Sequence, residues 1–314
     1  MVDNYSAAYN QQCAIAEAII AGAGRRLSSA ELRELLVERI RARPAQASVD
    51  RELLSSIRLA IALSPYAGDE PELVAHYMAA RRRDIERRLP ALSDAIRACR
   101  SRLLPLPVIV SCEKYLDIAL RLRGELAAHY FALNPMVIRG DVTLEEERYE
   151  NGVLSLPVHD AYEGLPLKMM EFYTLLASLG DCGVLKLDDD TGIASGVALE
   201  ENRVRSLFST GDYLGKPVEN ILHDRIWHHG KCTRPVPFIY GKPVKAHWAR
   251  GALYYLSAHA LRTLSRHYLR FPGAIEGELY EDKAVGDILY DNQIRLVPAV
   301  LELSLGFGTT TAHR

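Results

Sequence analysis

Apolar residues recur at helical spacing through the first third of the chain. Ser28 and Glu31 stand at the two ends of a capping-box pattern that opens one amphipathic run, and Pro44 is expected to end it. Further helical runs are expected at residues 14–20, 51–63, 72–88 and 92–103. Together these runs predict an all-helical domain over residues 1–104.

The pattern changes after the Pro105-Leu106-Pro107 stretch, where short β-branched runs begin to alternate with helical ones. Strands are expected at residues 108–111, 136–139, 153–158 and 184–187, and helices at residues 116–127 and 167–179. Such alternation predicts an α/β domain with a mainly parallel central sheet over residues 105–314.

Polar residues follow several of the expected strands. Because ligands of parallel sheets bind at the carboxyl ends of the strands, we expect these residues to share one edge: Ser111, Arg139, Asp160 and Asp188 to Asp190. The three consecutive aspartates repel one another, and carboxylates are the ligands that magnesium and manganese prefer. The sequence therefore predicts a cation site here, with a solvated acidic turn as the alternative.

Composition limits the possible functions. Of 314 residues, 48% are hydrophobic and 25% charged, which is typical of a globular protein, and the net charge of −2 gives no electrostatic sign of nucleic-acid binding. Five scattered cysteines argue against a zinc ribbon and a disulfide framework. No stretch approaches the roughly 18 apolar residues of a membrane span. We expect a cytoplasmic protein.

The helical third carries one concentrated basic run, from Arg81 to Arg88. This run could contact the inner face of a membrane or another anionic partner. Interleaved Asp84 and Glu86 favour instead a salt-bridged, solvated helix face. We expect the helical domain to recruit an acceptor or to mediate homo-oligomerisation.

Three separated segments resemble the family of inverting β-1,3-galactosyl- and N-acetylglucosaminyltransferases that includes Fringe. The first runs from Asp160 through Tyr162 to Lys168, and the second is Lys186-Leu187-Asp188-Asp189-Asp190. The third begins at Tyr213-x-Gly215, continues over residues 248–257, and ends at Glu281-Asp282-Lys283-Ala284-Val285-Gly286. The resemblance covers residues 105 to about 300. It implies the nucleotide-sugar-binding fold called GT-A.

The resemblance also implies roles for individual residues in holding a UDP-sugar and a Mn²⁺ or Mg²⁺ ion. Asp190 would be the direct metal ligand, with Asp188 and His313 as further candidates. Asp188 and Asp189 would also contact the ribose and the sugar or a metal-bound water, and Lys186 would balance their charge. Further donor contacts are expected from Ser111, Asp160 and Lys168. The alternative for Lys186 is a strand-edge lysine that reaches solvent. The alternative for Lys168 is a surface lysine of the following helix.

An acceptor hydroxyl becomes a good nucleophile only when a base takes its proton. Asp282 matches the position of that base. The adjacent Glu281 is a candidate acceptor contact, as are the more distant Trp248 and Tyr254. In the alternative interpretation the two acids cap a helix and the aromatic residues belong to the core. Adjacent His228 and His229 point in different directions on any regular element, which argues against joint metal ligation.

The sequence therefore predicts a metal-dependent inverting glycosyltransferase that uses a UDP-sugar and builds a β-1,3 linkage on a glycan or a lipid-linked acceptor. A non-catalytic, cation-dependent module that binds a glycan or a partner is the first alternative. A phosphohydrolase of the Asp-x-Asp-x-Thr kind is the second, although Gly192 stands where that motif needs threonine.

Overall fold

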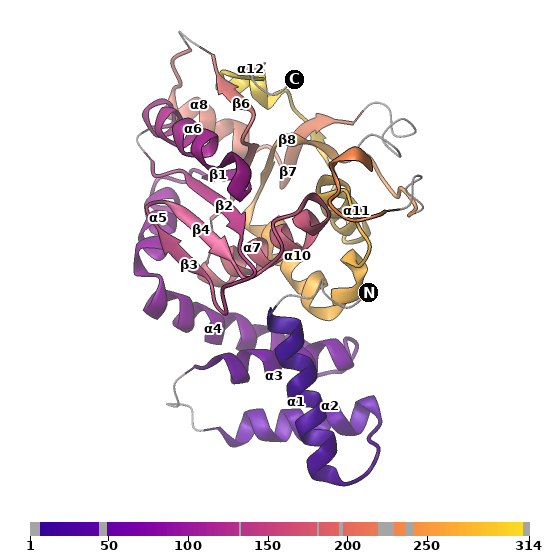
Figure 1. Ribbon diagram of the computed structural model, residues 1–314. Coiled ribbons are helices and arrows are strands. Elements are labelled where there is room, and N and C mark those ends of the chain that lie inside the picture. Colours follow the sequence, from indigo (N-terminus) through magenta and orange to yellow (C-terminus); the bar gives the residue numbers. More distant parts are fainter. Residues whose placement is uncertain are drawn as a thin grey trace.

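The computed structural model describes residues 7–43, 49–131, 133–180, 182–194, 197–218, 229–236 and 242–309. Five helices come first: α1 (Ala7–Ala23), α2 (Ser29–Ala42), α3 (Arg51–Leu63), α4 (Glu70–Arg88) and α5 (Pro90–Ser101). The capping box at α2 is confirmed, because the Ser28 side chain accepts from the Glu31 amide and the Glu31 carboxylate accepts from the Ser28 amide. In Figure 1 the first three helices project below the rest of the protein.

A mixed, mostly parallel sheet of eight strands follows, in the order β3-β4-β2-β1-β5-β8-β7-β9. The strands β4, β2, β1 and β5 are parallel to one another, whereas β8 runs antiparallel to both β5 and β7. Their bounds are β1 (Leu106–Val110), β2 (Met136–Gly140), β3 (Arg148–Glu150), β4 (Val153–Leu156), β5 (Val184–Asp188), β7 (Tyr213–Pro217), β8 (Ala249–Leu256) and β9 (Val297–Pro298). The α/β prediction is thus confirmed. A separate pair joins β6 (Thr191–Ile193) to β10 (Phe307–Thr309).

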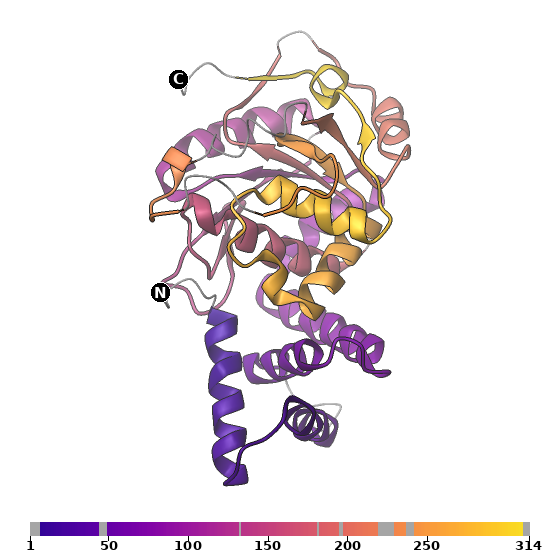
Figure 2. The same ribbon diagram turned by 90° about the vertical axis from the view of Figure 1, so that its right-hand side faces the viewer.

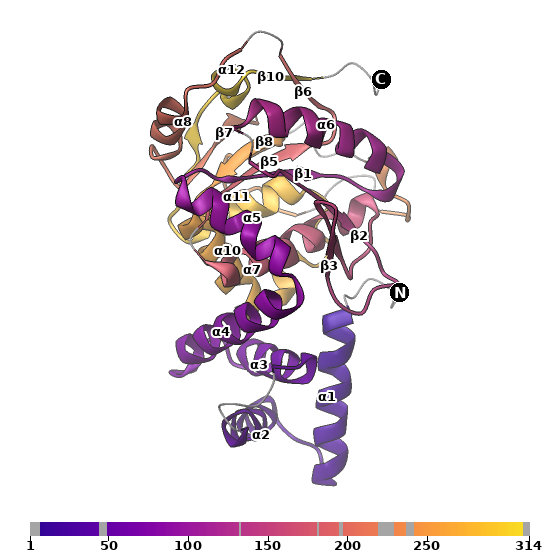
Figure 3. The same cartoon turned by 90° about the vertical axis from the view of Figure 1, so that its left-hand side faces the viewer.

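Helices cover both faces of the large sheet. Helix α6 (Leu116–His129) lies on one face, and α7 (Leu165–Leu179), α10 (Ala258–Arg270) and α11 (Glu281–Asp291) lie on the other (Figures 2 and 3). Two shorter helices, α8 (Glu201–Phe208) and α12 (Leu301–Leu305), flank the sheet. Among the described residues, no helix is long and apolar enough to cross a membrane.

The apolar core divides earlier than the boundary expected after residue 104. One cluster joins α1 to the first part of α4 and includes Leu36, Ile57 and Leu269 of α10. The sheet's own cluster begins at Ile85, near the end of α4, and takes in the buried face of α5. Helical spacing alone cannot distinguish a helix that packs on other helices from one that packs on a sheet, and the division after residue 104 stays a prediction.

A polar contact also fastens the helices to the sheet-bearing part. Arg58 of α3 donates two hydrogen bonds to Glu171 of α7, at 3.1 and 2.8 Å, and Tyr268 of α10 donates a third to the same carboxylate. The Arg58 and Glu171 side chains are only 7% and 15% exposed, so removing one partner would leave the other charge buried.

The arginine run of α4 forms further ion pairs between the helices and the sheet-bearing part. Arg81 and Arg88 pair with Asp84 of their own helix and with Glu147 before β3, and Arg82 pairs with Glu86. The salt bridges expected in this run are therefore confirmed, but the expected solvated face is wrong for Arg81, Asp84 and Arg88. These side chains are largely buried and join α4 to the segment before β3.

We expect a fragment of residues 105–314 to fail to fold cooperatively. It lacks the buried side chains of Ile85, Leu89, Leu92 and Ile96. Losing one such side chain typically costs about 2–5 kcal/mol, against a total stability of about 5–15 kcal/mol. A fragment of residues 64–314 keeps these side chains and should melt cooperatively at a lower temperature than the whole protein. Melting curves of both fragments, followed by circular dichroism, measure this difference. Cooperative melting of the shorter fragment would support a domain boundary after residue 104.

Candidate functional site

The polar residues expected at one edge of the sheet do lie there. Ser111 directly follows β1, Arg139 is in β2, Asp188 ends β5, and Asp160 follows β4 after a short loop. The register confirms the alignment, since Val110 of β1 pairs with Asp188 on one side and with Ile138 on the other. The Ser111 hydroxyl donates to the Asp189 carboxylate at 2.7 Å. Parallel pairing thus brings residues 78 positions apart into direct contact.

Asp160 and Lys168 hold this edge together from within. The Asp160 carboxylate accepts hydrogen bonds from the Gly140 amide, the Glu113 amide and the Lys168 ammonium group, at 2.7 to 2.9 Å. Lys168 also donates to the Ser111 carbonyl at 2.7 Å. Its side chain is 3% exposed, so the surface-lysine alternative is wrong. Both residues fix the loops after β1 and β2, and a direct contact to a donor stays a prediction.

Lys186 of β5 is buried directly beneath the aspartates. Its side chain is 1% exposed and pairs with Asp188 at 2.5 Å, while Glu281 lies 3.9 Å away. It also donates to the Gly251 carbonyl of β8. Burial by itself would lower the pKa of Lys186, but the charges of Asp188 and Glu281 outweigh burial and raise it. The alternative of a lysine reaching solvent is therefore wrong.

Glu281 and Asp282 form the first turn of α11, and their side chains take different directions. Glu281 is buried and accepts from Tyr254 and, at 3.4 Å, from Tyr173. Asp282 accepts from the Gly251 amide at 3.0 Å and from its neighbour's amide at 2.8 Å. The two acids lie in the first turn, but Tyr280 is the N-cap residue and no side chain caps the helix, so the capping alternative is wrong. Asp282 instead contacts β8 through the Gly251 amide.

The electrostatics of this pair are unusual for carboxylates. Burial, with the adjacent Glu281 charge, raises the pKa of Asp282 to about 7, and Asp188 acts in the same direction. Burial also raises the pKa of Glu281. A carboxyl group poised near neutral pH can accept a proton during a reaction, which is the property expected of a general base.

Gly251 connects the two acidic parts of the site. Its carbonyl accepts from Lys186, which pairs with Asp188, and its amide donates to Asp282. A Cβ atom at this position would lie 3.3 Å from the Asp282 carboxylate. In the sequence, Gly251 was noted only as part of the third resembling segment. Its contacts to both acidic parts depend on the antiparallel pairing of β8 with β5, which the hydrophobic pattern did not predict.

The three aspartates are partly exposed at the strand end, and their surroundings suit a divalent cation. Burial and the nearby Asp188 charge raise the pKa of Asp190, so these two carboxylates repel each other. In the described part of the chain, no group of three or more His, Cys, Asp or Glu is arranged to hold a metal. Magnesium commonly binds one or two carboxylates and completes its shell with water and phosphate oxygens, so Asp188 and Asp190 fit this mode. His313 lies outside the described residues.

Two residues that sequence reasoning did not assign also lie at the site. Burial raises the pKa of Tyr162, and the charges of Asp282 and Asp188 raise it further, so this phenol lies close to both parts of the site. The Lys231 ammonium group lies 5.6 Å from the centre of the Tyr162 ring. Nothing in the sequence pattern pointed to Lys231, because it follows a long stretch without recognisable periodicity.

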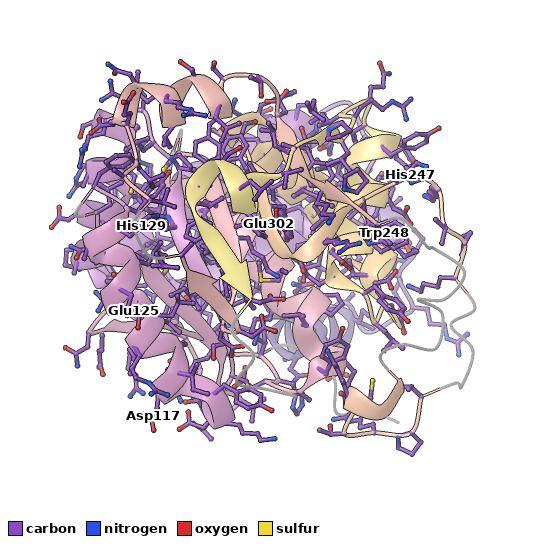
Figure 4. The ribbon with its side chains drawn as sticks, turned by 90° about the horizontal axis from the view of Figure 1, so that it is seen from above. Asp117, Glu125, His129, His247, Trp248 and Glu302 are labelled. Carbon is purple, nitrogen blue, oxygen red and sulfur yellow. The ribbon has the colours of Figure 1, made fainter. Side chains whose placement is uncertain are left out.

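The aromatic residues expected to contact an acceptor are packed inside the protein. Tyr254 is 0% and Trp248 3% exposed, and the Tyr254 hydroxyl group contacts Tyr173 at 2.5 Å. Gly286 of α11 passes so close to Trp248 that a Cβ atom would lie 2.4 Å from the tryptophan's own Cβ. Figure 4 shows Trp248 on the side opposite His129 of α6. In this arrangement neither ring presents a face to a sugar, and the core interpretation fits them. Of the histidine pair, His228 and the His229 side chain lie outside the described parts.

Comparison with known proteins adds no identification. The sequence matches no model of a protein family and no curated protein. A functional assignment therefore has to come from the residues of the site and from the three resembling segments.

Proposed function

We propose that this protein is a metal-dependent inverting glycosyltransferase of GT-A fold that transfers a sugar from a UDP-sugar. The observation that carries the proposal is the connection through Gly251, which places a carboxyl group with a pKa of about 7 beside a cluster of three aspartates. A cation-binding strand end next to a general base is what transfer from a nucleoside diphosphate requires.

In this proposal each acidic group has its own task. Asp188 and Asp190 hold Mn²⁺ or Mg²⁺, whose charge would stabilise the diphosphate that leaves. Asp282 takes the proton of the acceptor hydroxyl group. Lys186, buried between Asp188 and Glu281, keeps the carboxylates of both segments in place. Ser111 orients Asp189 toward the donor side through its hydrogen bond.

The acceptor class follows from the resemblance alone, and we propose a glycan or lipid-linked saccharide receiving a β-1,3-linked sugar. A thermal-shift screen of nucleotide sugars with and without manganese tests the proposal. We expect a rise in melting temperature for UDP-sugars that requires the metal, followed by slow release of free sugar from one of them. Metal-dependent binding without any release or transfer would favour the non-catalytic module instead.

The pH dependence of transfer should reflect Asp282. Below its pKa the carboxyl group is protonated and cannot accept the acceptor's proton, so activity should rise as pH increases through about 7. A cation bound nearby would favour the carboxylate and move this midpoint to lower pH. Initial rates from pH 4.5 to 9 give the midpoint. Rates that are flat over this range in the unmodified protein would remove Asp282 from the role of base.

A further inference from the structure

A short segment far from the aspartates in sequence lies against the site. It contains the turn η3 (His229–Lys231) and continues to Thr233. Thr233 donates to the Glu163 carboxylate from its amide at 3.1 Å and from its hydroxyl group at 2.6 Å. Glu163 belongs to the turn η2 (Tyr162–Gly164), directly before α7. These two bonds fasten the segment to the loop that also carries Tyr162.

Lys231 is the exposed cation of this segment, and its ammonium group lies over the face of Tyr162. Within the described residues, no carboxylate is within ion-pair distance of this group. Tyr162 follows Asp160 by two residues, and Asp160 bonds to the Gly140 amide at the strand edge where Ser111 contacts Asp189. The Lys231 ammonium group therefore lies beside this edge. A lysine held by an aromatic face can exchange that weak contact for a stronger anionic one.

We propose that Lys231 binds the diphosphate of the donor, on the side of the aspartates that faces Tyr162. This inference rests on the proposed function and names a further residue for it. Asp188 to Asp190, Glu281 and Asp282 make the site rich in carboxyl groups, and Lys186 is buried and already engaged with Asp188. A diphosphate would bring still more negative charge. Lys231 supplies a second, protein-borne cation in addition to the metal.

The reaction gives this cation a task in the chemical step. As the acceptor oxygen bonds to the anomeric carbon, the bond from that carbon to the β-phosphate oxygen breaks, and its electron pair stays on that oxygen. The acceptor's proton goes to Asp282. The added charge on the leaving UDP is therefore largest in the transition state, where an ammonium group in contact with it is most effective.

The test compares three ligands in calorimetric titrations with manganese present: UDP, UMP and uridine. For Lys231→Gln we expect the dissociation constant of UDP to rise roughly 10- to 100-fold, the loss typical of one hydrogen bond to a charged group. Uridine binding should not change, because it carries no phosphate. Lys231→Arg should restore most of the UDP affinity.

Lys245→Gln is the matched control, since Lys245 pairs with Asp291 at the far end of α11. It should bind all three ligands as the unmodified protein does. Equal UDP affinity of Lys231→Gln and the unmodified protein would overturn the role of Lys231 while leaving the proposed function intact. If the unmodified protein itself binds UDP no more tightly with manganese than without it, the proposed function fails instead.

Discussion

Replacing Asp282 with asparagine is expected to lower the rate of sugar transfer by about 10²- to 10⁴-fold, the usual contribution of a general base. Asparagine has nearly the same shape and retains one oxygen that can accept from the Gly251 or the Lys283 amide. It cannot take a proton at neutral pH. The affinity for UDP with manganese should stay unchanged, because the base acts on the acceptor and not on the donor.

Steady-state rates of transfer and calorimetric UDP affinities measure the two effects separately. Asp291→Asn is a suitable control, because this residue ends the same helix and, among the described residues, its ion pair is with the exposed Lys245. A variant at position 282 that retains transfer within a few-fold of normal would make Asp282 a structural residue at the start of α11. Glu281 is a poor substitute as base, since its carboxylate is buried against Tyr254 and Tyr173.

Replacing Asp190 with alanine is expected to abolish the effect of manganese on UDP affinity. Asp190 is held near Asp188, and its raised pKa reflects burial and that neighbouring charge. Removing one of the two carboxylates assigned to the cation leaves it too few protein ligands to be retained by Asp188 alone. Repulsion also disappears, so the variant should be at least as stable toward heat as the unmodified protein in the absence of metal.

Calorimetric titration of UDP at several manganese concentrations measures the first effect, and thermal melting without metal measures the second. Asp94→Ala serves as the control, since this exposed residue of α5 pairs with Arg97 of the same helix, away from the strand edge. Full manganese dependence in the Asp190 variant would assign the cation to other ligands.

The sequence predicted the local elements and the shared strand edge well, because both follow from short-range patterns. Helix α3 begins and ends where its apolar spacing placed it, at Arg51 and Leu63. Ser111 and Asp188 meet because parallel strands present their carboxyl ends on one side. Lys186 in an apolar run could equally have been a strand-edge residue, and only the position of β5 in the interior of the sheet decides for burial.

Contacts between distant segments could not be predicted from the sequence. The position of Tyr254 in β8 suits either a core residue or a ligand contact. Helices α7 and α11 pack behind this strand and bury Tyr254 beside Tyr173 and Glu281. Lys231 approaches the site because Thr233 bonds to Glu163, a pairing over 70 residues that no local pattern encodes. Nothing in the spacing of α5 revealed that its apolar face covers the sheet.

Metal-dependent binding of the donor is tested by a calorimetric titration of the unmodified protein with UDP, first in manganese and then in a metal chelator. Metal-dependent transfer from a UDP-sugar requires that the diphosphate be held largely through the cation at Asp188 and Asp190. We predict binding that is far tighter with manganese than with the chelator. Equal affinity under both conditions would rule out a cation-dependent glycosyltransferase, because the diphosphate would then be held by protein groups alone.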